Sequence, residues 1–203
     1  MRWLIGAMLW AGAAMAQDRA GEFDYYVLAL SWSPTWCAGE GQGAEQCERE
    51  LGFVLHGLWP QYEYGWPDYC RTEARDPSRR ETGAMADIMG SDGSAWHQWQ
   101  KHGRCSGLSS EGYFALAREA FERIERPAIL RQVEEAVRLS PSVVEEAFLE
   151  ANPELEPDGV TITCRDRRIQ EARICLTREL EPRLCGRDVR RDCTGTAELL
   201  PIR

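Results

Sequence analysis

Eight cysteines constrain the fold of this 203-residue chain more than any other feature of its sequence. Their number is even, and all of them follow an N-terminal segment that has the features of an export signal. We therefore expect four disulfide bonds, formed in an oxidising compartment. No two cysteines have the C-x-x-C spacing of many metal sites, which makes metal binding by cysteine the weaker interpretation. Eight cysteines can pair in many ways, so their spacing alone leaves the connectivity open.

The N-terminal segment predicts a secretory signal peptide over residues 1–16. Arg2 gives it a positive start, an apolar run extends to Ala14, and Ala14-Met15-Ala16 has the small-x-small pattern of a cleavage site. The apolar run is shorter than the roughly 20 residues that span a bilayer, which disfavours a membrane anchor. We expect a single domain over 17–203, a periplasmic or extracellular location, and no membrane association.

The charge balance limits how the chain can bind a partner. Without the signal peptide it has 23 basic and 33 acidic residues, a net charge of −10. Such a chain does not present a broad basic face to a nucleic acid. A polyanionic substrate would have to be bound locally, in a small cleft. We expect the protein to be a monomer.

Strands are predicted near both ends of the chain. Four segments are rich in aromatic and β-branched residues and are bounded by turn residues. They are Phe23–Trp32, Phe53–Trp59, Gly159–Cys164 and Ile169–Thr177. Gly57 and Pro60 are expected to interrupt the second strand, which would leave His56 at the open end of that strand.

Helices are predicted between the second and third strands. One contains His97, with N-caps available in Ser91–Ser94, and three others have apolar residues at helical spacing or a capping residue. Those three are Glu111–Arg126, Ala128–Leu139, and a helix that Ser140-Pro141 opens and that ends before Pro153. Residues 61–83 predict a long loop, and the last twenty or so an irregular tail. Strands, then helices, then strands predict an α+β fold with a mostly antiparallel sheet flanked by helices.

Chemically versatile residues are concentrated in two short segments that contain tryptophan. Residues 96–105 hold two of the three histidines and the only lysine, and the third histidine lies in Leu55-His56-Gly57-Leu58-Trp59-Pro60. On a helix, His97, Gln98, Lys101 and His102 fall within about 140° of one another. Trp96 and Trp99 would lie on the other side and anchor the helix. A single histidine is usually structural, but this clustering predicts a functional site.

These two segments resemble the active-site signatures of the ribonuclease T2 family. The matching residues are His56-Gly57-Leu58-Trp59-Pro60 and His97-x-x-x-Lys101-His102-Gly103-x-Cys105. Leu30-Ser31-Trp32-Ser33-Pro34-x-x-Cys37 also resembles the family's first strand. The resemblance covers roughly residues 23–193 and is closest to the bacterial branch, the periplasmic ribonuclease I type. It implies the disulfides Cys37–Cys47, Cys70–Cys105, Cys164–Cys193 and Cys175–Cys185.

The resemblance implies a secreted endoribonuclease that cleaves single-stranded RNA with low base specificity. The reaction would be a transesterification through a 2′,3′-cyclic phosphate, without metal or other cofactor. His102 matches the general base and His56 the general acid, two roles that suit imidazole because its pKa lies near neutral pH. Lys101 would stabilise the charge on the phosphate oxygens, and His97 would bind the phosphate.

Three positions need separate comment. Gln98 stands where the family usually has glutamate, so we expect a slower but active enzyme whose maximal rate rises in Gln98→Glu. Trp59 resembles the family's base-stacking platform, although a core tryptophan would look the same in the sequence. Gln61 stands where an acidic residue is often found, which leaves the base preference open. We treat Trp59 and Gln61 as candidate substrate-binding residues.

Two alternatives follow from the same residues. The first is a weakened or inactive protein of this fold that acts by binding RNA or a protein partner, an interpretation based on Gln98. The second is a metal-dependent phosphoesterase with His56, His97 and His102 as ligands. Zinc sites usually use histidines four residues apart or nearby carboxylates, and His97 and His102 are five apart without an adjacent acidic residue. Sensitivity to a chelator would distinguish the second alternative.

Overall fold

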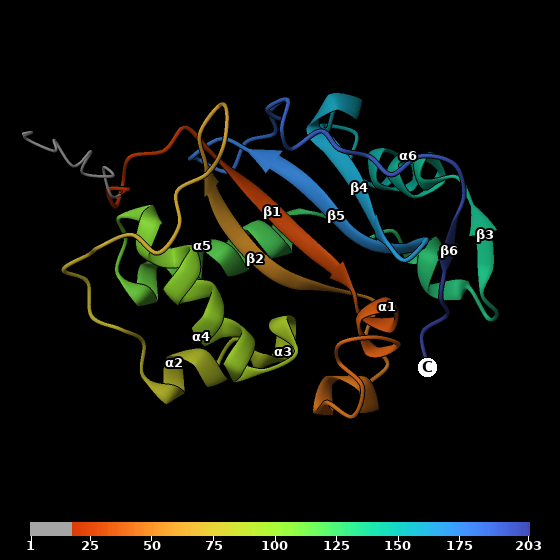
Figure 1. Ribbon diagram of the computed structural model, residues 1–203, viewed down its shortest axis with the longest axis horizontal. Helices are drawn as coiled ribbons and strands as arrows, with labels where there is room; N and C mark the ends of the chain where they lie inside the picture. The colour runs from red at the N-terminus through yellow and green to blue at the C-terminus, as the bar shows by residue number, and fades with distance from the viewer. Residues whose placement is uncertain (1–17) are drawn as a thin grey trace, which may run out of the picture.

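The computed structural model describes residues 18–203 (Figure 1). The predicted signal peptide and the expected start at Gln17 lie outside the described residues. Among residues 18–203, none of the helices is both long and apolar enough to cross a membrane.

A mostly antiparallel sheet of six strands runs through the centre of the fold (Figure 1). The strands are β1 (Tyr25–Trp32), β2 (Phe53–Gln61), β3 (Val137–Leu139), β4 (Val160–Arg165), β5 (Arg168–Leu176) and β6 (Ala197–Leu199). The order is β2-β1-β5-β6-β3, with β4 paired to β5. Only the short β5–β6 contact is parallel among the pairings described. The predicted α+β class and the antiparallel character of the sheet are confirmed.

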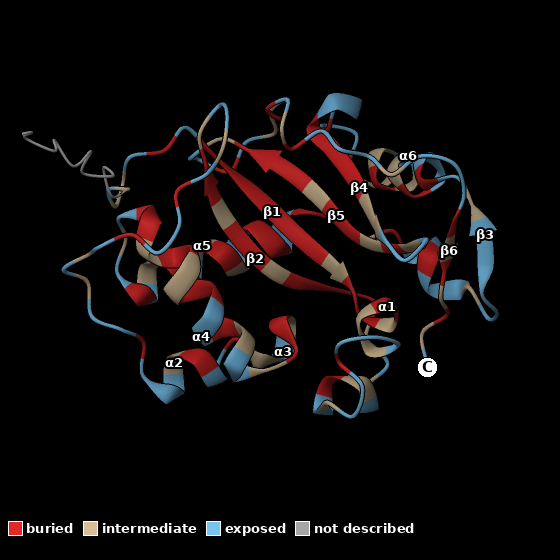
Figure 2. Cartoon of the chain, in the orientation of Figure 1, coloured by how far each residue is buried: buried red, intermediate tan, exposed pale blue. Residues whose placement is uncertain are grey.

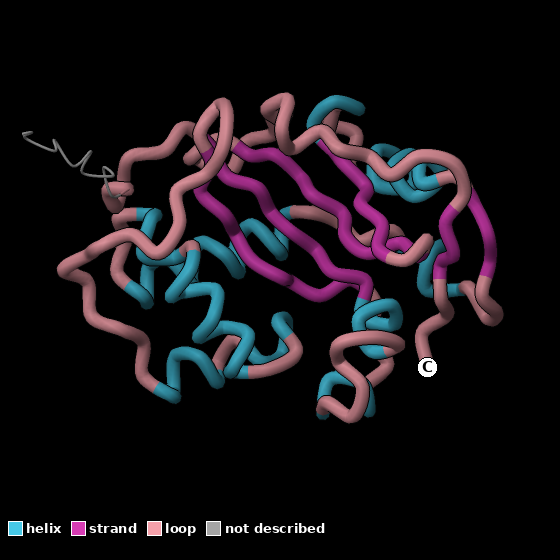
Figure 3. The backbone as a smooth tube through the Cα atoms, viewed as in Figure 1, coloured by secondary structure: helices cyan, strands magenta, loops and turns pink. Residues whose placement is uncertain are grey.

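Short helices surround the sheet, and loops make the longer connections (Figure 3). The α-helices are α1 (Ser33–Cys37), α2 (Arg79–Gly83), α3 (Ala86–Met89), α4 (Asp92–Lys101), α5 (Ser110–Arg123) and α6 (Pro141–Ala151). The 3-10 turns are η1 (Glu45–Glu48), η2 (Gly103–Ser106), η3 (Ala128–Gln132) and η4 (Pro157–Gly159). Helices α2 to α5 lie together beside β2, and α6 packs against β4 (Figure 1).

Alternation along β1 gives the sheet two chemically different faces. Tyr26, Leu28, Leu30 and Trp32 belong to the main apolar core, which also includes inward-facing residues of α5 and α6 (Figure 2). Val27 faces the other way, in a smaller cluster with the Cys175–Cys185 disulfide and one side of Trp59. The second face is therefore free to carry polar side chains above a small apolar floor.

The cysteines of the described chain form four disulfides, and none of them is free. The pairs are Cys37–Cys47, Cys70–Cys105, Cys164–Cys193 and Cys175–Cys185. These are the pairs that the family resemblance implies. Three of them attach irregular segments to regular ones: Cys70–Cys105 joins the long loop to η2, Cys175–Cys185 joins the tail to β5, and Cys164–Cys193 joins the tail to β4.

Two predicted elements are wrong. The strand that contains His56 does not end there, because β2 continues to Gln61 as an edge strand, where Pro60 is tolerated. The helix expected over 128–139 is instead η3 followed by β3, which pairs with β6. Most of residues 131–138 are exposed, so a helix there would have no apolar face to bury.

The remaining predicted elements agree with the structure to within a few residues. Helix α4 begins after Ser91, whose hydroxyl accepts a hydrogen bond from the Ser94 amide at 3.1 Å. Helix α6 follows Ser140 with Pro141 in its first turn. Helix α2, absent from the prediction, starts with a capping box formed by Ser78 and Glu81 within the segment expected to be a loop.

Candidate active site

His56 lies at a bulge in β2. In the pairing of β2 with β1, Gly57 faces Ala29 and Leu55 faces Leu30, so His56 is the extra residue. A bulge bends the strand and changes the direction of a side chain. The His56 side chain is 41% exposed, between buried neighbours on both sides in the strand. The bulge thus directs an imidazole out of the middle of a strand, not from its end.

Helix α4 lies against β2 and presents the second group of predicted residues. Trp99 is fully buried and donates its indole N–H to Asp76 at 2.8 Å. The same carboxylate accepts from Arg104 at 2.8 Å, and these bonds hold the outer side of the helix. The expectation that Trp96 also anchors α4 is wrong, because its side chain is exposed and Ala95 occupies the buried position.

Trp59 connects the two signatures. Its indole N–H donates to Gln98 Oε1 at 2.7 Å, its ring is stacked on His102 with 5.1 Å between centroids, and its edge meets His56 at 5.1 Å. A Cβ at Gly57 would collide with both atoms of the Trp59–Gln98 hydrogen bond. Glycine is therefore required beneath this bond, and Trp59 lies between the two signatures with one side on the small apolar cluster.

His102 ends α4 and is the most buried of the three histidines. Burial first, and then the positive charges of Lys101, His56 and His97, lower its pKa from 6.5 to about 3. Within residues 18–203, Nδ1 is buried without a hydrogen-bond partner, whereas Nε2 is not among the buried unpartnered atoms. The ring is therefore neutral over the physiological range, with Nε2 as the nitrogen that reaches solvent.

Lys101 and His97 lie one turn apart on the side of α4 that lines the cleft. Lys101 makes no ion pair among the described residues, although acidic side chains are abundant elsewhere on the surface. Burial and then the charges of Lys101 and His56 lower the pKa of His97. These effects show that positive charge accumulates at this position without a neutralising carboxylate on α4.

Two charged residues of β5 extend the site. Glu171 is buried, and its Oε1 accepts from His56 Nδ1 at 2.5 Å. Its Oε2 accepts from Arg173 Nε at 3.0 Å and Nη2 at 2.8 Å. Burial alone would raise the pKa of Glu171, but the hydrogen bond and charge of His56 and the charge of Arg173 lower it to about 2. Glu171 is thus an anion in the folded protein.

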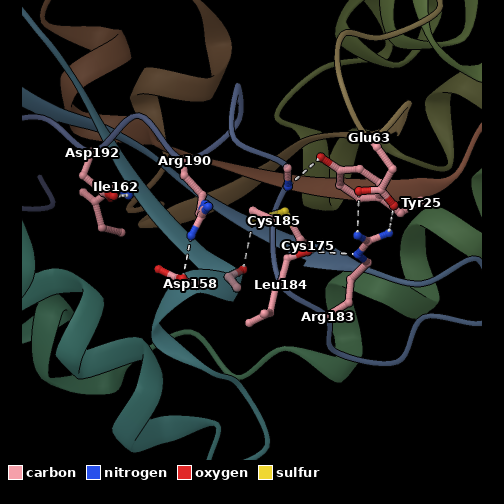
Figure 4. Close-up of a disulfide and its surroundings, with 12 residues drawn as sticks. Tyr25, Glu63, Asp158, Ile162, Cys175, Arg183, Leu184, Cys185, Arg190 and Asp192 are labelled. Carbon is pink, nitrogen blue, oxygen red and sulfur yellow. Dashed lines mark hydrogen bonds and ion pairs between the residues drawn. A yellow bond between two sulfur atoms is a disulfide. The ribbon is translucent and has the colours of Figure 1, made fainter.

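The C-terminal tail forms one wall of the site and is held by several polar contacts (Figure 4). Next to the Cys175–Cys185 disulfide, Arg183 pairs with Glu63 through two 3.0 Å hydrogen bonds, and the Gly186 amide donates to Tyr25 Oη at 3.1 Å. Asp188 then accepts from the Gly65 amide at 2.6 Å. These contacts bring the tail and the long loop together across the face of the sheet.

All seven predicted site residues line one cleft of about 240 Å³. They are His56, Trp59, Gln61, His97, Gln98, Lys101 and His102. A second cavity of about 460 Å³, which includes Thr35, Trp36 and Arg168, borders the site on its other side. His56 and Glu171 line this second cavity, so His56 is shared by both hollows.

The two candidate substrate-binding residues are placed differently. Gln61 is buried, and its side-chain amide donates to the carbonyl of Pro60 at 2.9 Å. Trp59 has His102 stacked on its ring and the guanidinium of Arg173 5.3 Å from its centroid. Trp66 also lines the cleft and is 54% exposed, which makes it the more open aromatic surface.

Sequence reasoning missed Glu171, Arg173 and Asp188, which the structure brings to the same site. Glu171 and Arg173 alternate with apolar residues in Ile169–Leu176, and two charges inside an apolar strand were the available signal. Asp188 had no comparable signal, because it lies in an irregular segment. No group of three or more His, Cys, Asp or Glu side chains in residues 18–203 is arranged to hold a metal ion.

Comparison with known proteins gives one family. The model of the ribonuclease T2 family matches residues 23–185. A ribonuclease of Aeromonas hydrophila is 45% identical over 130 residues, which are 63% of this chain and 60% of that protein. A probable ribonuclease of Haemophilus influenzae is 31% identical over 129 residues, 56% of this chain and 47% of that protein. The chain thus matches less than two thirds of the length of these relatives.

Solved structures share the fold at lower identity. An RNase-related protein from Calystegia sepium superposes with a TM-score of 0.72 at 21% identity, over 90% of this chain and 99% of that one. Trichomaglin, described as an S-like ribonuclease, gives 0.70 at 20% identity over 90% of this chain and 100% of its own. RNase NT in complex with 5′-AMP gives 0.64 at 22% identity, over 89% and 99%.

Proposed function

The chain belongs to the ribonuclease T2 family, and we propose that it is an endoribonuclease that cleaves single-stranded RNA by metal-independent transesterification. The observation that carries the proposal is the position of His56 and His102, two imidazoles that line one cleft and both lie next to Trp59. RNA contains its own nucleophile, the 2′-hydroxyl. The enzyme then needs a base, an acid and positive groups at the phosphate.

His102 is the general base in this proposal. A pKa of about 3 keeps the ring neutral, so that it can accept a proton at weakly acidic and neutral pH. Nε2 takes the proton of the 2′-hydroxyl as that oxygen attacks the phosphorus atom. The imidazolium formed on His102 lies face to face with the ring of Trp59, which stabilises a cation through its π-electrons.

His56 is the general acid. Because Nδ1 donates to Glu171, Nε2 is the nitrogen turned away from that carboxylate and available to the substrate. It gives its proton to the 5′-oxygen as the P–O bond breaks, which leaves a 2′,3′-cyclic phosphate on the upstream product. Hydrolysis of the cyclic phosphate follows with the two histidines in exchanged roles.

Positive and donor groups on α4 stabilise the phosphate. Lys101 lines the cleft one residue before the base, and its ammonium group offsets the charge that develops on the non-bridging oxygens. His97 contributes to phosphate binding from the mouth of the cleft. Gln98 Oε1 is occupied by the Trp59 N–H, which leaves the amide Nε2 as a further donor.

The two hollows beside His56 accommodate the two sides of the scissile bond. The cleft with Trp59, Gln61 and Trp66 takes the nucleoside that carries the 2′-hydroxyl. The larger cavity takes the leaving nucleoside. The general acid His56 has to lie next to the 5′-oxygen that it protonates, and His56 also lines this cavity. Aromatic stacking accepts many bases, in agreement with low base specificity. The four disulfides and the predicted signal peptide support an exported location, periplasmic or extracellular.

The test is cleavage of single-stranded RNA, and of a DNA strand that contains one ribonucleotide, by oxidised protein in excess EDTA. Wild type is compared with His56→Ala and His102→Ala, and mass spectrometry identifies the ends. We expect cyclic phosphate ends at the single ribonucleotide from wild type only, and a loss of about 10²-fold or more in each variant. Intact RNA across the pH range would overturn the proposal and favour a binding function. Cleavage that stops in EDTA would favour a metal-dependent phosphoesterase.

A further inference from the structure

Glu171 has the contacts of a residue that acts through His56. It is buried on the cleft face of β5, between the two hollows that share His56. Four donor contacts reach its carboxylate: Ser31 Oγ at 3.3 Å, His56 Nδ1 at 2.5 Å, and two from Arg173 at 3.0 and 2.8 Å. Both oxygens are occupied, so the carboxylate can hold the imidazole in only one orientation.

Arg173 lines the cleft and has donors that its pairing with Glu171 does not use. Its Nε and Nη2 bind Glu171, while Nη1 makes no hydrogen bond with the described residues. The guanidinium carbon lies 5.3 Å from the ring centroid of Trp59, and the side chain is 30% exposed in the cleft. The planar guanidinium can therefore bind a carboxylate with one edge and a phosphate oxygen with another.

We propose that Glu171 is the positioning residue of the general acid His56, and that Arg173 is a catalytic residue that binds the scissile phosphate. This assignment rests on the proposed ribonuclease function. It also explains how the site works with Gln98, because the carboxylate and the second cation are supplied from β5 instead of α4.

If Glu171 and Arg173 had only a structural role, this buried position beside the cleft would not be expected to hold a charged pair. A buried carboxylate is costly unless it is fully hydrogen-bonded, and an apolar residue of similar size would fill the position at less cost. Glu171 is buried, and its carboxylate is in contact with donors of Ser31, His56 and Arg173. His56 is the one partner of Glu171 that takes part in the proposed reaction. Without the carboxylate, Nδ1 would no longer be fixed as a protonated nitrogen, and either tautomer of the imidazole could form.

The charges around His56 make Glu171 its main counter-charge. From α4, the ammonium group of Lys101 and the imidazole of His97 face the same cleft, together with the neutral ring of His102. From the tail, Asp188 lines the far wall. Among these groups, Glu171 alone is in direct contact with His56, and its charge is opposite to that of an imidazolium.

The charged groups of the second cavity are largely neutralised by their own partners. Arg165 pairs with Glu40 at 2.6 Å, and Arg168 lies 3.4 Å from Glu198. Asp166 also lines this cavity, in the turn between β4 and β5. Glu171 is therefore the charge in this region that reaches His56 directly.

The decisive experiment compares two leaving groups. Uridylyl-adenosine has a 5′-alkoxide that needs a proton to leave, whereas uridine 3′-(4-nitrophenyl phosphate) has a phenolate that leaves without one. We expect Glu171→Gln to lower kcat about 10–100-fold on the dinucleotide and less than about 3-fold on the nitrophenyl ester, with little change in KM. The alkaline limb of its pH–rate profile on the dinucleotide should move to lower pH, because the acid loses its proton more readily.

Arg173 is tested on the same two substrates. We expect Arg173→Gln to lower kcat/KM about tenfold or more on both, because the phosphate is common to them, and Arg173→Lys to restore part of the loss. The matched controls are Asp87→Asn and Arg118→Gln, which break a two-bond ion pair between α3 and α5 that lines neither hollow. Both controls should retain wild-type rates.

The ratio of the two rates in Glu171→Gln does not depend on the fraction of folded enzyme, so partial unfolding of that variant does not obscure the result. For Arg173→Gln, whose losses are expected to be equal, the rates are divided by the folded fraction measured by circular dichroism. Equal losses on both substrates in Glu171→Gln, or an unmoved alkaline limb, would overturn the positioning role. A wild-type rate in Arg173→Gln would overturn phosphate binding. A wild-type protein that cleaves neither substrate would instead overturn the proposed ribonuclease function itself.

Discussion

The amide of Gln98 has a defined orientation because of its neighbour. The indole of Trp59 can only donate, so the atom 2.7 Å from it must be the oxygen of Gln98. The NH₂ group is then on the other side of the amide, and the residue offers a donor where a glutamate would offer an acceptor. Glutamine is thus compatible with an active site, and what is lost is a negative charge beside Lys101 and the two imidazoles of α4.

Gln98→Glu tests the effect of that charge. One carboxylate oxygen can keep the bond from Trp59, and the added charge should stabilise the imidazolium of His102 and raise its pKa. We expect kcat to rise several-fold and the acid limb of the pH–rate profile to move to higher pH. Steady-state kinetics on a dinucleotide between pH 3 and 8 measures both effects, with Gln132→Glu in the exposed end of η3 as control. An unchanged or lower kcat would contradict this account.

His102 links stability to pH. Its pKa is about 3 in the folded chain and 6.5 without the protein environment, so between these values the unfolded chain binds the proton more strongly. Stability is complete above pH 6.5 and is lost as the pH falls toward 3. Glu171 adds a loss in the same direction as the pH falls from 4.5 toward about 2.

The expected difference in the free energy of unfolding between pH 7 and pH 4 is about 3 kcal/mol from His102. Urea unfolding at the two pH values measures it. His102→Gln removes the titrating group and should reduce the difference by most of that amount. The same pH dependence in wild type and variant would show that His102 does not titrate as the buried position requires.

At the scale of elements, structure that depends on residues close in sequence could be predicted, whereas contacts between strands that are distant in sequence could not. Helix α4 and its N-cap follow from capping and spacing within a dozen residues. The bulge at His56 depends on the register of β2 against β1, and the pairing of β5 with β1 brings Glu171 to Ser31, 140 residues away. The residue pattern within one strand gives neither the register of a strand pair nor which strands pair. The polar partners of His56 were missed for this reason.

Substitution of Gly57 tests the contact between β2 and α4. In Gly57→Ala the new methyl group would displace Trp59 or Gln98, and overpacking of this kind costs about 1–3 kcal/mol. We expect kcat/KM to fall about tenfold or more, because Trp59 also supports His102. Gly83→Ala is the control, since nothing lies within 4 Å of a Cβ there. Thermal melts measure the stability of both variants, and steady-state kinetics measures their kcat/KM. A fully active Gly57→Ala protein would contradict this prediction.

At the scale of the molecule, the site depends on segments outside the sheet, such as the long loop, that strand pairing does not hold in place. The Cys70–Cys105 disulfide joins the long loop to the turn after His102, and the Tyr69 amide donates to the Lys101 carbonyl at 2.9 Å. Within residues 18–203, these links position the end of α4 relative to the loop that carries Trp66. The overall fold can therefore survive while the cleft loses its shape.

Removal of Cys70–Cys105 by two alanines should affect stability and activity together. The bond closes a segment of 35 residues, so we expect a loss of about 4 kcal/mol and at least a tenfold fall in kcat/KM. The matched control removes Cys164–Cys193, which closes 29 residues and should cost a similar free energy. Urea unfolding and kinetics separate the two cases. Equal activity losses in both variants would show that stability alone explains the effect.

The disulfides have a consequence for the cell that makes the protein. A ribonuclease endangers its producer from the moment it leaves the ribosome, since messenger and ribosomal RNA surround it. Glutathione and thioredoxin keep cytosolic thiols reduced, so the newly made chain would lack the bonds that hold the loop and the tail around the cleft. On the proposed ribonuclease function and the proposed export, oxidation after translocation would be the step that makes the protein active, and the producer would be protected without a dedicated inhibitor.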